Sequence, residues 1–474
     1  MPPQRASSFK PAATIAAACI ATAMLMLDIS VINTALSDMA RGLSTDLSGL
    51  QWVIDAYTVP LAAVVLTAGA LADRFGRRRL FIAGLVVFTA ASAVCGAASG
   101  IGMLVAARAV QGLGAAILFA TGLALISQVT PDKESRLKAL AAFGASIGAS
   151  FAIGPFVGGV LVESFGWRAI FLINVPIGMV ALWIALTRVA EGRDPVARRV
   201  DVPGQLTLIG GLFLLVLGLL RGNEDGWGST GILAILGGAV ALLVAFAVIE
   251  ARSAQPMLPL GLLRERRFAG SQITVFAMAA SYFSIFLYMT LYLQQVLGLS
   301  PIETGLAYLP GTGLMFVVSG MAAQFGARFD SARLASVGLA LTAAGMALGL
   351  FTTVDSSWTV LLPAILLSSL GCGMFNPAAS ELALSALPPE QSGLASGAND
   401  TFRQTGIAVG IAALGTLVPA TALGGDPQAY VDGFHHATIA AVAVAGVGAV
   451  ATWWCYRTPS VRPVEVDERV AVAA

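Results

Sequence analysis

The sequence predicts an all-α polytopic membrane protein with 14 transmembrane helices, arranged as two six-helix bundles and an inserted helix pair. Hydrophobic residues make up 57% of the 474 residues and charged residues 11%, whereas about 25% of a soluble chain is charged. The mean hydropathy is +0.83, and a water-soluble fold of this size needs far more polar surface. The 52 glycines suit lipid, where small residues let helices pack closely.

Fourteen segments are long and apolar enough to cross the hydrocarbon core, which takes about 20 helical residues. Most connections between them are short, so we expect neighbouring helices to be antiparallel. In chain order the segments run at about 12–37, 49–72, 80–98, 102–129, 137–163, 168–189, 203–221, 230–251, 267–297, 302–326, 332–352, 357–387, 393–421 and 434–456.

Composition also argues against several other functions. A net charge of +1 argues against nucleic-acid binding. We expect no metal, no cofactor and no obligate protein partner, and the absence of a nucleotide-binding loop argues against ATP as the energy source. The cysteines lie in apolar stretches without ligand spacing, so we interpret them as buried hydrophobes: Cys19, Cys95, Cys372 and Cys455.

The basic residues predict the orientation of the chain in the membrane. With the N-terminus in the cytoplasm, 22 of the 27 lysines and arginines fall on the inner side and 3 on the outer side, while Arg108 and Arg403 fall inside helices. We therefore expect both termini and the segments 190–202 and 252–266 to be cytoplasmic. No cleavage site precedes Asp28, which indicates a retained first helix. Abundant alanine and arginine suggest a GC-rich bacterial genome, and so a bacterial inner membrane.

A weak internal repeat predicts the domain organisation. The segment 71–78 after the second helix is similar to 323–328 after the tenth, and a Gly-x-Gly pair follows two helices later in each case, at 112–114 and 371–373. We expect an N-terminal bundle at 1–190, an inserted pair with cytoplasmic linkers at 191–266, a C-terminal bundle at 267–457 and a cytoplasmic tail at 458–474. Transporters of this plan bind substrate between the bundles, which makes the inserted pair peripheral.

The strongest local motif lies between the second and third segments and reads Gly69-Ala70-Leu71-Ala72-Asp73-Arg74-Phe75-Gly76-Arg77-Arg78-Arg79. Glycine permits a tight turn and close helix approach, and Asp73 can pair with an arginine or cap a helix. A positive-inside anchor explains the arginines but not the spacing of the other residues. Here the sequence resembles the major facilitator superfamily, whose signature loop has this form. The resemblance implies a conformational-switch loop of Gly69, Asp73, Arg74, Gly76 and Arg77.

Further motifs are similar to those of the fourteen-helix drug/proton antiporter family within that superfamily. The resemblance covers nearly the whole chain apart from its tails, and it implies alternating access with export coupled to proton entry. The matching stretches are Leu27–Leu36, Arg108–Gly114, Gly148–Gly159, Trp167-Arg168, Asn174-Val175-Pro176 and Arg403–Gly406.

The fifth segment carries the stretch that accompanies antiport in similar proteins. Proline removes a backbone hydrogen bond and bends the helix. Small residues spaced by three or four give one smooth face, made of Gly148, Ala152, Pro155 and Gly159. Two interpretations are open: this face seals one end of the pathway, or it is static packing. The candidate residues of this antiport helix are Gly148, Gly154, Pro155, Gly158 and Gly159.

Three charged residues inside the first, second and fourth segments are the candidate proton-coupling residues, because charge inside a membrane is costly and is functional by default. Asp28, Asp55 and Arg108 all lie about 9–14 Å in from the outer end of their helices at about 1.5 Å per residue. A proton acceptor facing a fixed cation is the minimum equipment of a coupled exchanger. The alternative is a structural ion pair, which for Asp55, nearer the interface, is equally favoured.

A secondary charge group lies in the second half of the chain. Asp400 and Arg403 are spaced to pair on one helix face, which leaves Glu381 as the acid without a partner. We favour mutual neutralisation of this group over a functional role.

The ninth segment is rich in aromatic residues, and its candidate substrate-lining residues are Tyr282, Phe286, Met289 and Tyr292. Such a face suits a flat lipophilic substrate, and lipid-facing or interhelical packing explains it equally well. Together these observations predict a proton-coupled secondary transporter that exports a lipophilic small molecule, such as a drug, antibiotic or secondary metabolite, with protons and membrane lipid as its other partners. A facilitator-type permease is the alternative. A polytopic membrane enzyme is less favoured, because no loop carries a catalytic constellation.

Overall fold

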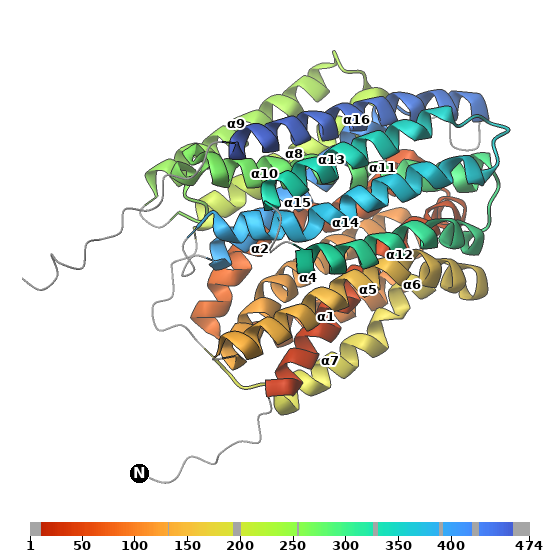
Figure 1. Cartoon of the computed structure of the whole chain (residues 1–474). Helices are drawn as coiled ribbons and strands as arrows, with labels where there is room; N and C mark the ends of the chain where they lie inside the picture. Colours follow the sequence, from red (N-terminus) through yellow and green to blue (C-terminus); the bar gives the residue numbers. More distant parts are fainter. Residues whose placement is uncertain are drawn as a thin grey trace, which may run out of the picture.

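The computed structural model describes residues 11–130, 132–192, 201–253, 256–325, 330–387, 392–419 and 426–457, and its regular secondary structure in these ranges is entirely helical (Figure 1). Within them, 13 helices are long and apolar enough to cross a membrane. A further long helix, α15, carries Asn399, Asp400, Arg403 and Gln404, which lower its hydropathy. The prediction of an all-α polytopic membrane protein is confirmed.

The long helices follow the predicted segments closely. They are α1 Pro11–Leu43, α2 Leu47–Phe75, α3 Arg77–Gly96, α4 Ile101–Val129, α5 Lys133–Phe165, α7 Asn174–Arg188, α8 Val202–Asp225, α9 Thr230–Arg252, α12 Pro301–Phe325, α13 Ser331–Ala347, α14 Leu362–Ser385, α15 Ser392–Gly415 and α16 Pro427–Tyr456. The short helix α6 (Ala169–Leu172) precedes α7, η4 (Leu348–Phe351) follows α13, and η5 (Trp358–Leu361) leads into α14. The last helix begins earlier than predicted because Asp426 caps its N-terminus.

The predicted span 267–297 is one continuous helical element of mixed type. It consists of α10 (Arg266–Met278), the π-helix η2 (Ala279–Phe283), α11 (Ser284–Leu291) and the π-helix η3 (Tyr292–Val296). The short helix η1 (Leu260–Arg264) leads into it. Wide π-turns of this kind are frequent at functional sites, and this element is the most buried span of the described residues.

Successive membrane-spanning helices run in opposite directions, so every connection between them lies at one of the two ends of the bundle. We call the end that carries Arg74 and Arg266 the basic end, and the end that carries Asp46 and Asp426 the opposite end. Side chains of Asp46, Asp132 and Asp201 accept hydrogen bonds from the first turns of α2, α5 and α8. Gly76, Gly166 and Gly226 follow α2, α5 and α8 with positive φ, a conformation that favours glycine.

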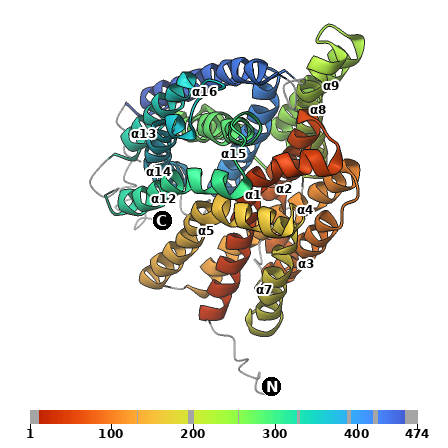
Figure 2. The ribbon, with the colours of Figure 1, turned by 90° about the vertical axis from the view of Figure 1, so that its right-hand side faces the viewer.

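Helices α1–α7 and α10–α16 gather on two sides of the molecule, which meet along two seams (Figure 2). One seam is α5 against α12, and the other is α2 against α15. Each Gly-x-Gly pair lets its helix pack closely against two neighbouring helices. Gly112 and Gly114 approach α2 and α3, and Gly371 and Gly373 approach α13 and α12.

The inserted pair packs on one flank of the molecule. Helix α8 lies against α9, α2 and α15, whereas most of α9 is exposed (Figure 2). The predicted domain boundaries at 190/191 and 266/267 stay predictions. The predicted tail at 458–474, and residues 193–200 and 254–255 of the predicted linkers, lie outside the described residues.

Candidate transport site

A buried ion pair joins two of the residues singled out from the sequence. Arg108 Nη1 on α4 lies 2.7 Å from Asp28 Oδ2 on α1, and each side chain is 1% exposed. The same nitrogen donates to Gln111 Oε1 at 2.7 Å, and Arg108 Nε donates to the carbonyl of Val53 at 3.0 Å. The guanidinium also lies over the ring of Tyr57, 4.1 Å from its centroid. Arg108 is therefore fixed from three directions.

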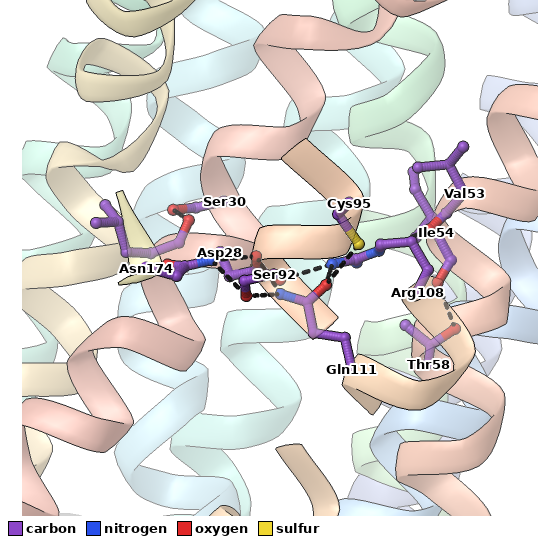
Figure 3. Close-up of polar contacts among 11 residues, drawn as sticks. Asp28, Ser30, Val53, Ile54, Thr58, Ser92, Cys95, Arg108, Gln111 and Asn174 are labelled. Carbon is purple, nitrogen blue, oxygen red and sulfur yellow. Dashed lines mark hydrogen bonds and ion pairs between the residues drawn. The ribbon is translucent and has the colours of Figure 1, made fainter. Parts of the chain in front are cut away.

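Asp28 is the acceptor at the centre of a larger polar network (Figure 3). Its Oδ1 accepts from Gln111 Nε2 at 2.9 Å and from Asn174 Nδ2 at 2.8 Å. Gln111 Nε2 also donates to Ser92 Oγ at 2.7 Å. The network thus draws on α1, α3, α4 and α7, and both carboxylate oxygens of Asp28 accept hydrogen bonds within it.

Asp55 lies outside that network. Its side chain is fully buried on α2, and neither carboxylate oxygen has a hydrogen-bond partner among the described residues. Because an isolated buried carboxylate is costly, this environment favours the neutral, proton-bearing form. The structure therefore brings together Asp28 and Arg108, and it places Asp55 apart from them in a different chemical setting.

A polar latch spans the α2–α15 seam one helical turn from Asp55, toward the opposite end. Gln51 Nε2 on α2 donates to Tyr288 Oη at 2.7 Å and to the carbonyl of Ile411 on α15 at 3.2 Å. Tyr288 on α11 also donates to that carbonyl. A second contact between the two sides, nearer the opposite end, is Gln294 Nε2 to the carbonyl of Thr34 at 2.9 Å.

The smooth face of α5 packs against α12. A Cβ at Gly159 would lie 2.8 Å from Ile302 Cα, and Gly305 of α12 comes equally close to α5, at Phe156 Cα and the carbonyl of Pro155. The carbonyl of Ala152 accepts from Thr312 Oγ1 at 2.7 Å. Toward the basic end the contact continues at Gly148, where a Cβ would lie 3.0 Å from Phe316. The other two glycines of the motif, Gly154 and Gly158, face Ser30 and Thr34 of α1 instead.

An ion pair and a backbone hydrogen bond fix the conformation of the switch loop. Arg77 donates to Asp73 Oδ1 through Nη2 at 2.9 Å and Nε at 3.0 Å, and its Nη1 donates to the carbonyl of Ala124 at 3.3 Å. The side chain of Arg74 is exposed, and its guanidinium lies over the ring of Phe75. Gly76 has φ +112°, and a Cβ there would lie 2.6 Å from Glu191 Oε1. Gly69 differs from expectation, because nothing lies within 4 Å of a Cβ at that position.

The secondary charge group is only partly assembled. Arg403 Nη2 donates to Asp400 Oδ1 at 2.6 Å, as their spacing predicts. Glu381 is exposed and accepts a hydrogen bond from Ser331. Glu381 thus belongs to no ion pair of the described residues.

Three of the predicted lining residues, Tyr282, Phe286 and Tyr292, pack within the C-terminal half. Tyr282 Oη lies 3.2 Å from Ser369 Oγ, and Phe286 stacks on Tyr308 at 4.2 Å. Tyr292 donates to the carbonyl of Thr353 at 2.7 Å. Met289 stays partly exposed. Phe283, which the sequence did not single out as a lining residue, is partly exposed and meets Phe151 of α5 edge-to-face at 5.6 Å.

Several residues of the Asp28 network and of the polar latch were not singled out as site residues from the sequence. Gln111 and Asn174 stand inside the family-like stretches, so intramembrane amides in those stretches were an available signal. Ser92 and Gln51 carry no such signal, because an isolated serine or glutamine in an apolar helix usually bonds to its own backbone or faces a loop.

The comparisons with known proteins agree with this architecture. The family model of the Major Facilitator Superfamily matches residues 18–411 and 321–471. The chain is 33% identical over 407 residues to multidrug resistance protein Stp of Mycobacterium tuberculosis, covering 86% of this chain and 76% of that one. It is 37% identical over 432 residues to puromycin resistance protein pur8 of Streptomyces alboniger, covering 89% and 86%. It is 36% identical over 406 residues to cephamycin export protein CmcT of Amycolatopsis lactamdurans, covering 84% and 83%.

Solved structures share the fold. A peptide transporter, POT, in complex with sulfate superposes with a TM-score of 0.67 at 15% identity, covering 94% of this chain and 95% of that one. A bacterial homologue of the lysosomal transporter Spinster, in an inward-facing and occupied conformation, superposes with a TM-score of 0.63 at 15% identity, covering 94% and 96%. From its helices, its motifs and these matches, the chain belongs to the major facilitator superfamily.

Proposed function

We propose that this chain is a secondary transporter that exports a lipophilic small molecule from the cytoplasm by alternating access, in exchange for protons. The observation that carries the proposal is the Asp28–Arg108 pair, a titratable acid and a fixed cation buried together inside a membrane protein. Family membership supports transport, and relatives named for antibiotic resistance or export support the direction and the substrate class.

We also propose a state of the transport cycle for this conformation. The basic end is cytoplasmic in our proposal, because positive charge favours that side. The hydrogen bonds that cross the seams between the two sides lie at mid-height or toward the opposite end. This conformation is therefore closed toward the outside, and Asp28 has released its proton and is compensated by Arg108.

Proton uptake then requires Asp28 and Arg108 to separate. When the seams open toward the outside, α1 and α4 shift relative to each other, and an Asp28 carboxylate without Arg108 becomes a proton acceptor. Asp55 assists, because its unpaired carboxyl holds a proton beside the α2–α15 seam. Return of Arg108 to Asp28 expels the proton toward the cytoplasm. The energy suffices, since one charge crossing about 100 mV releases about 2.3 kcal/mol and supports roughly a 40- to 50-fold gradient of a neutral substrate.

The substrate is proposed to be neutral or cationic and in part aromatic. Asp28 and Asp55 are the available acids, and Phe283 and Phe151 face each other across the two halves with accessible surface. Phe283 and Met289 are partly exposed residues of the aromatic segment. The buried residues Tyr282, Phe286 and Tyr292 pack behind them and do not line the proposed substrate path.

Flux in everted membrane vesicles tests the proposal. An imposed gradient, acidic inside the vesicle, should drive uptake of puromycin or a lipophilic fluorescent cation against its own gradient, and a proton ionophore should stop it. The alternative, a facilitator-type permease, predicts equilibration at the same rate with and without the proton gradient. Equal rates for every compound tried would refute proton-coupled export.

A further inference from the structure

Two carboxyl groups meet at the basic end of the inserted helix pair, far along the chain from the Asp28 network. Asp201 caps α8, and its Oδ1 accepts from Gly204 N at 2.9 Å. Glu250, in the last turn of α9, is 2% exposed, and its Oε2 accepts from Leu258 N at 3.0 Å. The other two oxygens, Asp201 Oδ2 and Glu250 Oε1, are buried and receive no hydrogen bond from the described residues. These two oxygens face each other, because both lie within 3.0 Å of the position that a Cβ of Gly204 would take.

Glycine at position 204 makes this contact possible. A Cβ there would lie 2.8 Å from Asp201 Oδ2 and 3.0 Å from Glu250 Oε1. Any side chain would therefore occupy the space through which the acid of α9 reaches the first turn of α8.

No cation compensates the two acids among the described residues. At the basic end, the charged residues on the elements packed around them are Arg252 of α9, Arg264 of η1, and Asp73 and Arg74 of α2. The three arginines are exposed, and Asp73 pairs with Arg77. None of the ion pairs of the described part of the chain includes Asp201 or Glu250.

Two ionised carboxylates this close, one of them on the buried Glu250, would repel each other at high cost. A metal ion is a poor remedy, because Ca²⁺ takes six to eight oxygen ligands and the described residues hold no cluster of three metal-ligating side chains. A single proton between the two oxygens removes the repulsion and makes a charge-assisted hydrogen bond.

We propose that Asp201 and Glu250 share one proton, and so form a proton-binding site separate from the Asp28–Arg108 pair. The site fastens the inserted pair to the rest of the molecule. Gln205, the next residue after Gly204, donates to the carbonyl of Ala63 on α2 at 2.9 Å, and Thr67 of α2 donates to Gln205. Thr67 also reaches Met257 Sδ at 3.2 Å, in the segment that follows α9. Loss of the shared proton loosens this junction between α8, α9 and α2.

Infrared spectroscopy of the purified full-length protein in detergent tests the site directly. At mildly acidic pH, the difference spectra of wild type minus Glu250→Gln and wild type minus Asp201→Asn should contain the same protonated-carboxyl C=O band, because either amide supplies an N–H donor in place of the shared proton. The protonated Asp55 is common to all three proteins and cancels in the differences. Carbon-13 labelling of glutamate and, separately, of aspartate should shift the same band in unsubstituted protein, a measurement that does not depend on a variant folding. The proposal is overturned if the difference spectra lack this band, or if neither label shifts it.

Stability gives an independent readout. The folded state holds a proton that the unfolded chain releases at lower pH, so the unfolding temperature of wild-type protein should fall by several degrees from mildly acidic to mildly alkaline pH. Glu250→Gln should lose most of that pH dependence. Gly204→Ala should weaken the infrared band, whereas the control Gly237→Ala, at an open position of α9, should not. An identical pH dependence in wild type and Glu250→Gln contradicts a shared proton.

Discussion

Arg108 Nη1 and Asp28 Oδ2 lie 2.7 Å apart with both side chains almost fully buried, and this contact joins helices whose contributing residues are 80 positions apart. Removing one partner leaves the other charge buried without compensation. The pair is therefore a structural constraint as well as the proposed coupling site.

The first prediction follows from that constraint. Arg108→Ala should destabilise the protein by about 3–5 kcal/mol, because Asp28 keeps only its amide donors. The double variant Asp28→Asn/Arg108→Gln should recover much of this loss, since no charge is then left unpaired. Thermal unfolding in detergent measures both, and an Arg108→Ala protein as stable as wild type would show that the pair is not buried as described.

The second prediction concerns the α5–α12 seam. Gly159→Ala should open it toward the opposite end, because the new Cβ meets the backbone of Pro301 and Ile302. A cysteine at Ala152, in a background without the native cysteines, should then react faster with a thiol reagent. Gly144→Ala on the same helix meets nothing within 4 Å and is the control. Equal rates in the two variants would exclude a sealing role for this face.

The third prediction separates the two glycines of the switch loop. Gly76→Ala should cost about 1–3 kcal/mol, because φ is +112° and the Cβ meets Glu191. Gly69→Ala should leave the unfolding temperature unchanged or slightly higher, because the position is open and lies inside α2. Similar losses in both variants would mean that the loop has another conformation.

The fourth prediction concerns the polar latch. Gln51→Ala removes the side chain that joins α2 to Tyr288 and Ile411 on the other side of the α2–α15 seam. Spin labels at Arg41 and Gln428, exposed positions near the opposite end, should show a longer and broader distance distribution than in wild type. An unchanged distribution would show that apolar packing alone holds this end closed.

The fifth prediction is the topology. A cysteine at Ser253 should resist membrane-impermeant thiol reagents added outside intact cells, whereas one at Gly228, at the opposite end, should react. The reverse pattern would invert the orientation and with it the direction of transport.

The fold was accessible from the sequence because a membrane protein repeats one signal many times. Each span needs about 20 apolar residues, so even α15, with Asp400 and Arg403 inside it, stands out between its neighbours. The π-turns at Ala279–Phe283 and Tyr292–Val296 could not be foreseen, because they depend on packing against α15 and α16 rather than on local sequence.

The candidate site was accessible only in part, for the same physical reason. Residue depth along a helix follows from counting, which placed Asp28, Asp55 and Arg108 at one level. The direction in which a side chain points around its helix depends on tertiary packing. Depth alone therefore did not show that Asp55 lies apart from Arg108. It also did not show that Gln111 and Asn174 are further hydrogen-bond donors to Asp28.

Asp28→Asn is the substitution that bears most directly on proton coupling. The asparagine keeps the shape of the side chain, but its NH2 group replaces an oxygen that accepts hydrogen bonds, and Arg108 loses its counter-ion. The variant should therefore lose stability, and its insertion and folding are measured before its flux. Asp38→Asn, at a partly exposed position about three turns further along α1, is the matched control.

The deciding measurement is substrate-driven proton flux in reconstituted vesicles that contain wild type, Asp28→Asn or Asp38→Asn. Proton-coupled export predicts that wild type and Asp38→Asn accumulate substrate uphill with proton counterflow, while Asp28→Asn at most equilibrates it. If Asp28→Asn still drives substrate against its gradient with normal proton counterflow, Asp28 is not the coupling site.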